Sequence, residues 1–175
     1  KLINIGRCTE QKNQILILKA IKLIKNKIPL KLLIAGSGKN FIRLKSYIRN
    51  NNLKRDVKLL NFLKNPYKYI SKADIVILSS NYEGLPNVLL EAQCLKKIIL
   101  STKCPTGPKE ILLNGKAGTF FKMNDFEDLA KKISFINDNK IKIKKKTNTG
   151  YKNLKRFDQQ TNLDRYYSIL KKYIS

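Results

Sequence analysis

The sequence contains no histidine and no tryptophan, and only three cysteines among its 175 residues. Without histidine, the chain cannot form a Ser-His-Asp triad, a Cys-His dyad or a His-ligated metal site. The cysteines, Cys8, Cys94 and Cys104, are widely spaced and form no CxxC pair, so neither a zinc site nor a disulfide framework is predicted. We therefore expect a chain without a bound metal that works in a reducing cytoplasm.

Long apolar runs are also missing. No stretch approaches the roughly 18 uninterrupted apolar residues of a membrane span, and no signal-peptide pattern is present. Hydrophobic residues still make up 42% of the sequence, which is enough for the core of one globular domain. The chain opens without Met, directly on the strand-like run Leu2–Ile5, and this beginning predicts a piece of a longer protein.

Acidic residues are few. Asp and Glu number 12 against 37 Lys and Arg, which leaves a net charge of +25. This charge suits nucleic acid or an anionic membrane, but the lysines are spread along every segment and no RNA-binding signature accompanies them, so nucleic acid is disfavoured. The densest run, Lys140–Lys146, is best interpreted as a solvated helix face. The alternative is peripheral contact with the anionic inner face of the plasma membrane.

Apolar runs alternate with helix-like segments along the chain. Continuous apolar strands separated by amphipathic helices predict a single Rossmann-like α/β domain over residues 1–138, with a doubly wound parallel six-stranded sheet in the order 3-2-1-4-5-6. The predicted strands are Leu2–Ile5, Leu30–Ala35, Val57–Leu60, Asp74–Leu78, Ile98–Leu100 and Ala117–Phe121. The predicted helices are Asn13–Asn26, Phe41–Asn50, Pro66–Lys72, Asn87–Leu95, Pro108–Leu113 and Asp125–Ile136.

Residues 139–175 differ from this pattern. They are basic, lack strand signals and carry apolar residues at helical spacing. We expect one helix before about Arg156 and another over Gln159–Ile174, packed on the sheet domain or on a missing partner domain.

Ligands of doubly wound sheets bind at the carboxyl ends of the strands. The first loop there, Gly6–Lys12, carries Arg7 and Lys12 next to a helix start. Two cations and free helix N–H groups suit a diphosphate. The alternative is two solvated cations.

Two of the scarce acidic residues flank the turn from the fourth strand to its helix: Glu83 falls in the loop and Glu91 one turn into the helix. Carboxylates accept hydrogen bonds from sugar hydroxyls, so the pair suits a polyhydroxy ligand. Gly84 allows close approach of the backbone, and the free amides of Asn87 and Val88 can face a phosphate. The alternatives are a capping carboxylate with a surface glutamate, or a glycosidase-like acid and base, which is disfavoured because the sequence does not place the two groups across one bond.

Two glycine-containing loops complete this edge. The segment Thr102–Ile111 is rich in Pro and Gly and is expected to wall the site, with loop rigidity favoured over phosphate contact by its lysines. The Gly36-Ser37-Gly38 turn follows the second strand and not the first, so it is interpreted as a tight turn and not as a dinucleotide fingerprint.

Together these motifs resemble the C-terminal, donor-binding domain of the family 4 glycosyltransferases, retaining enzymes with the two-domain GT-B fold. The resemblance covers about residues 2–136. It is carried by four marks in order: Ile5-Gly6-Arg7 with Lys12, Leu33–Gly38, Ala73–Ser80, and Glu83–Asn87 continuing to Glu91-Ala92, which matches the family's Glu-x7-Glu motif.

The resemblance implies a role for each site residue. Arg7 and Lys12 would bind the donor diphosphate, Glu83 the transferred sugar and Glu91 the ribose. The remaining donor contacts would be Gly84, Leu85, Asn87 and Val88 beside sugar and phosphate, and Phe62 and Leu63 in the Asn61–Leu63 loop beside the base. It also implies a retaining reaction that needs neither a divalent metal nor a cofactor, since the nucleotide sugar is a substrate.

The sequence departs from the family pattern at two places. Many members have Gly where this chain has Asn13, and Gly-Phe-Gly where it has Gly84-Leu85-Pro86, so one amide contact is lost at Pro86. In its Gly-Leu-Pro-Asn run and its Cys-Pro-Thr-Gly-Pro loop (104–108) the chain resembles those members that are typically bacterial transferases of surface polysaccharide, such as capsule or lipopolysaccharide, or of lipid-linked glycans. A UDP-linked hexose or N-acetylhexosamine donor is therefore expected.

A complete enzyme of this kind has an N-terminal acceptor domain, which is missing here. We expect the isolated chain to bind nucleotide weakly and to transfer no sugar. The alternatives are a non-catalytic nucleotide-binding module, and a basic protein that binds nucleic acid or a membrane surface.

Overall fold

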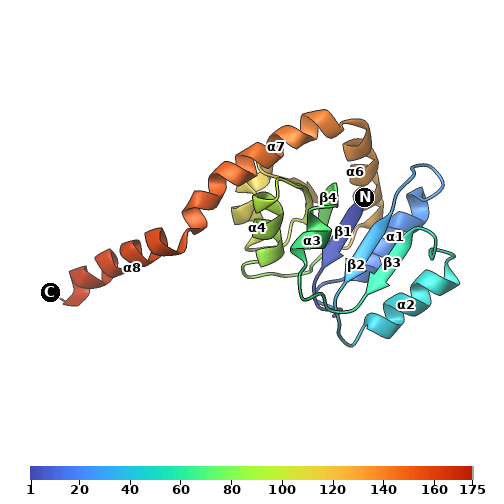
Figure 1. The fold of residues 1–175 in the computed structure, drawn as a ribbon, viewed down its shortest axis with the longest axis horizontal. Helices are drawn as coiled ribbons and strands as arrows, with labels where there is room; N and C mark the ends of the chain where they lie inside the picture. Colours follow the sequence, from blue (N-terminus) through green and yellow to red (C-terminus); the bar gives the residue numbers. More distant parts are fainter. Residues whose placement is uncertain (175) are drawn as a thin grey trace.

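The computed structural model describes residues 1–174 and places a six-stranded parallel sheet at the centre of the molecule (Figure 1). The strand order is β3-β2-β1-β4-β5-β6, with every neighbouring pair parallel, as the sequence predicts. The strands are β1 (Leu2–Ile5), β2 (Leu32–Ala35), β3 (Val57–Leu60), β4 (Ile75–Leu78), β5 (Ile98–Thr102) and β6 (Thr119–Phe121).

Helices fill each crossover between the strands and continue beyond the last one. They are α1 (Gln14–Ile24), α2 (Phe41–Asn50), α3 (Tyr67–Ile70), α4 (Asn87–Cys94), α5 (Pro108–Ile111), α6 (Phe126–Asp138), α7 (Lys140–Asn153) and α8 (Gln159–Ile174), with 3-10 turns at Leu113–Gly115 and Leu154–Phe157. Each predicted strand and helix of the sheet domain is present, with ends that differ from the predicted ones by at most two residues.

The prediction was wrong at the end of β5. The strand was expected to stop at Leu100, but it continues through Ser101 and Thr102. Both residues are buried although they are polar, so the sequence does not mark them as part of a buried strand. Pairing with β6 explains the extension, because Ser101 lies opposite Phe120 and Thr102 opposite Phe121 in the ladder.

The two faces of the sheet are buried by different helices. Neighbouring strand residues point to opposite faces, so Leu2 joins the cluster formed with α1, α2 and α6, and Ile3 joins the cluster formed with α3, α4 and α5. Ile17 and Ile21 of α1 are 0% exposed, and burying a side chain of this size contributes about 1.5–3 kcal/mol. These two layers hold the strand ends, and the loops that follow them, in place.

Helix α7 packs on this domain through a minority of its residues. Ile143, Thr147 and Gly150 are buried, and Lys146 Nζ donates to the carbonyls of Gly115 and Gly118 at 2.8 and 3.0 Å. Burial lowers the pKa of Lys146 from its ordinary value. The densest basic run therefore contributes one of its lysines to packing.

Helix α8 projects away from the sheet domain (Figure 1). Its side chains from residue 159 to residue 169 are exposed, including the apolar Leu163, Tyr166, Tyr167 and Ile169. No helix within residues 1–174 combines the length and the low charge needed to cross a membrane.

The Gly36-Ser37-Gly38 turn fixes the loop that follows β1. Cys8 N donates to Ser37 O at 2.8 Å, and Asn40 N donates to Cys8 O at 2.9 Å. A Cβ atom on Gly36 would lie 1.9 Å from the carbonyl oxygen of Gly6. The glycine is therefore required by a backbone-to-backbone approach between two loops.

Replacing Gly36 with alanine is expected to lower the free energy of unfolding by about 1–3 kcal/mol, because the new methyl group must displace backbone atoms. Denaturant unfolding monitored by circular dichroism measures the change. Gly84→Ala is the matched control, since nothing lies within 4 Å of a Cβ atom there, and it should stay within about 0.5 kcal/mol. Equal losses in the two variants would contradict this explanation.

Candidate functional site

The loops after β1 and β4 are joined at the carboxyl edge of the sheet. Asn81 N donates to Gln11 O at 2.8 Å, Ser79 Oγ donates to Lys12 O at 2.7 Å, and Gln11 Nε2 donates to Tyr82 O at 3.0 Å. One of these bonds joins two main-chain atoms, and the other two join the side chains of Ser79 and Gln11 to main-chain carbonyls of the opposite loop. The two loops that the sequence singled out therefore form one structure.

At the centre of this structure, Lys12 contacts Glu83. Lys12 Nζ lies 2.5 Å from Glu83 Oε1, and Ser80 Oγ donates to the same oxygen at 2.5 Å. The Glu83 side chain is 6% exposed and that of Lys12 is 17% exposed. A carboxylate this deeply buried is costly unless it is paired and hydrogen-bonded, and the lysine and serine meet that need on one oxygen. Within residues 1–174, Glu83 Oε2 has no hydrogen-bond partner.

The loop after β5 forms the wall behind Glu83, as predicted. Thr106 Oγ1 donates to the carbonyl oxygen of Glu83. A Cβ atom on Gly107 would lie 1.8 Å from the carbonyl oxygen of Gly84, so only glycine permits this approach. Cys104, in the same loop, is fully buried, and its burial raises the pKa of its thiol.

The opposite side of the Glu83 loop is open. No atom lies within 4 Å of the position of a Cβ on Gly84, and Leu85 is 52% exposed. Helix α4 begins at Asn87, and its first main-chain bond runs from Leu89 N to Pro86 O at 2.9 Å. The N–H groups of Asn87 and Val88 precede that bond and are available to an anion.

Glu91 lies one turn into α4 and is half-buried. Burial raises the pKa of its carboxyl group, and no hydrogen bond to its side chain forms within residues 1–174. A desolvated carboxylate without a partner destabilises the fold, and such groups are common at functional sites.

The other predicted residues stand apart from the Lys12–Glu83 pair. Arg7 is exposed, and its carbonyl oxygen accepts a bond from Gln14 Nε2 at 3.0 Å. Phe62 is 74% exposed and Leu63 is half-buried, both in the loop after β3. No hydrogen bond or ion pair among the described residues links the side chains of Arg7, Phe62, Leu63 or Glu91 to the pair.

Three residues of the site were missed by reasoning from the sequence. Ser80 and Thr106 hold Glu83, but serine and threonine are common in loops and give no distinctive signal. Asn13 adopts the left-handed conformation (φ 46°), and its side chain donates to Asn81 Oδ1 at 3.2 Å and to Asn124 Oδ1 at 3.0 Å. Glycine adopts this conformation freely and asparagine tolerates it, which explains how asparagine fits at this position.

Metal-ligating side chains are dispersed across the described residues, which contain no group of three or more His, Cys, Asp or Glu that could hold an ion. The charged side chains predicted for the site are Arg7, Lys12, Glu83 and Glu91.

Glu91→Gln is expected to raise the free energy of unfolding at neutral pH. Burial lifts the pKa of Glu91 above its ordinary 4.5, so ionisation favours the unfolded chain. The stability gained from glutamine should shrink as the pH falls from the raised pKa of the folded protein to 4.5. Below 4.5 the carboxyl group is protonated in both the folded and the unfolded chain. Urea unfolding across this pH range measures the effect. The exposed Glu127 serves as the control, because Glu127→Gln should give no gain, and a gain there equal to that of Glu91→Gln would disprove the explanation.

The chain matches known proteins both in sequence and in fold. The model of the family described as "Glycosyl transferases group 1" matches residues 1–156. The chain is 43% identical over 111 residues to an uncharacterized glycosyltransferase of Methanocaldococcus jannaschii, covering 63% of this chain and 27% of that protein. It is 28% identical over 142 residues to a Campylobacter jejuni N-acetylgalactosaminyltransferase named for a diphospho-undecaprenol-linked acceptor, covering 81% of this chain and 38% of that protein.

Among solved structures, Anabaena Alr3699/HepE in complex with UDP superimposes with a TM-score of 0.87 at 19% identity, covering 98% of this chain and 48% of that one. At this identity the match establishes a shared fold. The chain spans well under half the length of these curated relatives and about half of the Anabaena chain.

Proposed function

The chain belongs to the glycosyl transferases group 1 family, and on that premise we propose that it is the donor-binding domain of a glycosyltransferase. Its ligand is a nucleotide diphosphate sugar bound at the carboxyl ends of the strands. The observation that carries the proposal is the contact between Lys12 and Glu83, which places a cation suited to a diphosphate beside a carboxylate suited to sugar hydroxyls.

In this proposal the diphosphate is bound by Arg7, Lys12 and the start of α4. Arg7 offers paired donors, Lys12 turns from Glu83 toward the phosphate, and the free N–H groups of Asn87 and Val88 face the same charge. These groups stabilise the departing nucleotide electrostatically. The proposed transfer retains the anomeric configuration and uses no divalent metal.

The two glutamates divide the rest of the donor between them. Glu83 binds hydroxyls of the transferred sugar, and Glu91 binds the ribose, where its burial strengthens a hydrogen bond to a hydroxyl group. The remaining contacts are Gly84 and Leu85 beside the sugar and Phe62 and Leu63 beside the base.

UDP is the proposed nucleotide, carrying a hexose or an N-acetylhexosamine. The Anabaena structures that share the fold contain UDP and UDP-glucose, and the Campylobacter relative is named for N-acetylgalactosamine transfer to a lipid-linked glycan. The proposed acceptor is accordingly a glycan or a lipid-linked glycan of bacterial surface polysaccharide synthesis, modified on the cytoplasmic side of the membrane.

The rest of the enzyme lies outside this chain in the proposal. Residues 1–138 form the donor domain and residues 139–175 the closing helices, of which α7 packs on the sheet domain and α8 presents its exposed apolar residues to an N-terminal acceptor domain. The isolated chain then binds donor without transferring sugar.

Arg7→Ala is expected to weaken UDP binding roughly tenfold or more, since a hydrogen bond to a charged group contributes about 1.5–3 kcal/mol. Isothermal titration calorimetry with UDP measures the change. Lys103→Ala is the matched control, because Lys103 is an exposed cation on a neighbouring loop. If both variants lost affinity to the same extent, diffuse attraction by a basic protein would replace a specific site. No binding of UDP, GDP or ADP by the unsubstituted chain would overturn the proposed function.

Glu91→Ala is expected to weaken UDP and UDP-glucose by the same factor, because both carry the ribose. Glu83→Ala should weaken UDP-glucose selectively, since plain UDP lacks the sugar and the substitution releases Lys12 from its partner. The ratio of the two dissociation constants, measured for each variant, tests this division. A loss of plain UDP in Glu83→Ala as large as that of UDP-glucose would show that the roles are assigned wrongly.

A further inference from the structure

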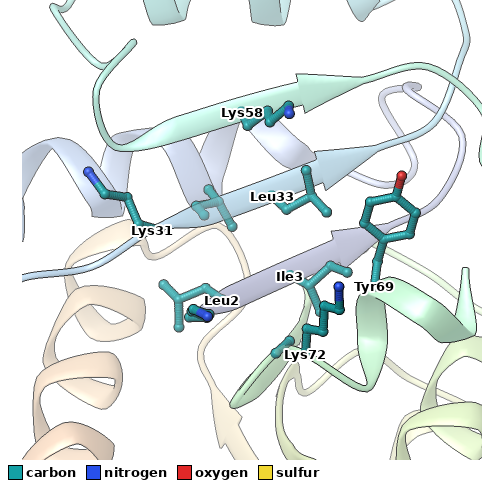
Figure 2. A pocket seen from close by; sticks show the side chains of 10 residues that line it. Leu2, Ile3, Lys31, Leu33, Lys58, Tyr69 and Lys72 are labelled. Carbon is teal, nitrogen blue, oxygen red and sulfur yellow. The ribbon is translucent and has the colours of Figure 1, made fainter.

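The sheet has one face that its helices leave partly open. The helix nearest to β1, β2 and β3 on this face is α3, a single turn whose Ile70 packs in one cluster with Ile3. A hollow of about 220 Å³ remains between the strands and α3. Figure 2 shows Ile3 and Leu33 along its floor and Tyr69 at its side. The floor is apolar, and Leu33 is only half-buried in a parallel sheet, where strands are normally covered on both faces.

Lysines surround the hollow. Four lysines, Lys1, Lys31, Lys58 and Lys72, are among its described lining residues, and no carboxylate is. Lys31 pairs outside the hollow with Asp56 at 3.6 Å. Lys31 Nζ donates to Arg55 O at 2.6 Å. The ammonium groups of Lys58 and Lys72 form no hydrogen bond or ion pair with any residue in 1–174. Unpaired cations thus stand over an apolar floor.

The neighbouring surface has the same character. Tyr67 is 53% exposed and Tyr69 is 36% exposed, and the exposed Lys64 and Lys68 lie in the same segment. Tyrosine has an apolar ring and a polar hydroxyl group, and lysine has a long apolar chain below its ammonium group. Side chains of this kind are found at membrane–water interfaces.

We propose that this lysine-rimmed hollow docks the domain on an anionic lipid bilayer, with lipid phosphates on Lys58 and Lys72 and apolar lipid atoms against Leu33 and Tyr69. The hollow is smaller than the roughly 300–1,000 Å³ of ordinary small-molecule pockets. In this proposal it therefore holds only part of a lipid, and the rest of that lipid stays in the membrane. Each lysine near an anionic surface adds to the attraction. The basic run on α7 is a weaker candidate, because the half-buried Lys146 is bonded to the domain and Lys140 pairs with Asp74.

The hollow lies at the amino-terminal half of β1 and β2, whereas the candidate donor site follows their carboxyl ends. The two sites share no residue, so this proposal does not depend on the proposed function. UDP binding, measured on the same samples, reports on the donor site and on the fold.

The test is cosedimentation with vesicles of phosphatidylcholine alone or mixed with phosphatidylglycerol. The chain is expected to bind only the anionic vesicles, and the double variant Lys58→Glu/Lys72→Glu should lose roughly tenfold or more in binding. The control is Lys142→Glu/Lys144→Glu on α7, which changes the net charge equally and should lose clearly less. Equal losses, or no binding to anionic vesicles by the unsubstituted chain, would overturn the proposal.

A neutral variant separates a bilayer from a soluble polyanion. Tyr69→Ser keeps the charge and should weaken vesicle binding while leaving retention on heparin unchanged. Tyr166→Ser on α8 is the matched control and should alter neither. If Tyr69→Ser bound vesicles as well as the unsubstituted chain while the lysine variant lost heparin retention, the occupant would be a soluble polyanion and the bilayer would be excluded.

Discussion

A buried carboxylate in a strongly basic protein organises this structure. Glu83 is nearly inaccessible to solvent and satisfies its charge with Lys12 and Ser80 on one oxygen. Leaving such a group without a partner would cost more than most single contacts contribute. The pairing therefore ties the loop after β1 to the loop after β4, while Thr106 and Gly107 hold the same segment from β5. Three strand ends are brought together at one carboxylate.

The same contact gives the site two states that differ by an exchange of partners. Without a ligand, the charge of Lys12 is neutralised by Glu83. In the proposed complex the lysine faces a phosphate and the carboxylate faces hydroxyl groups, so each retains a polar partner and neither is left bare in a site of low dielectric. Glu91 has no such substitute and carries the cost of its burial in the free protein. The paired Glu83, in the loop after β4, and the unpaired Glu91, in α4, thus lie in consecutive parts of the chain.

Much of this architecture could be predicted from the residue pattern. Runs such as Ile75–Leu78 are continuous and apolar because both faces of a parallel sheet are buried, and the strand order follows from the fold class. Arg7, Lys12, Glu83 and Glu91 were predicted to share a site because charged residues are conspicuous in the segments that follow strands. Among them, the structure brings Lys12 and Glu83 into contact. Ser80, Thr106 and Asn13 were not, since their importance arises from neighbours that lie far away in the sequence. The end of β5 was missed for the same reason: Ser101 and Thr102 are polar, and their burial depends on pairing with β6.

The approach of Gly107 to the carbonyl oxygen of Gly84 is a contact between main chains. The contact depends on main-chain atoms, which every residue has, and on the absence of a side chain at Gly107. The rim of the site therefore keeps its outline while the exposed side chains on it, Leu85 and Asn87, are free to vary. Under the proposed function, substitution of these two side chains changes the surface that a bound sugar would meet, while the main chain beneath it keeps its shape.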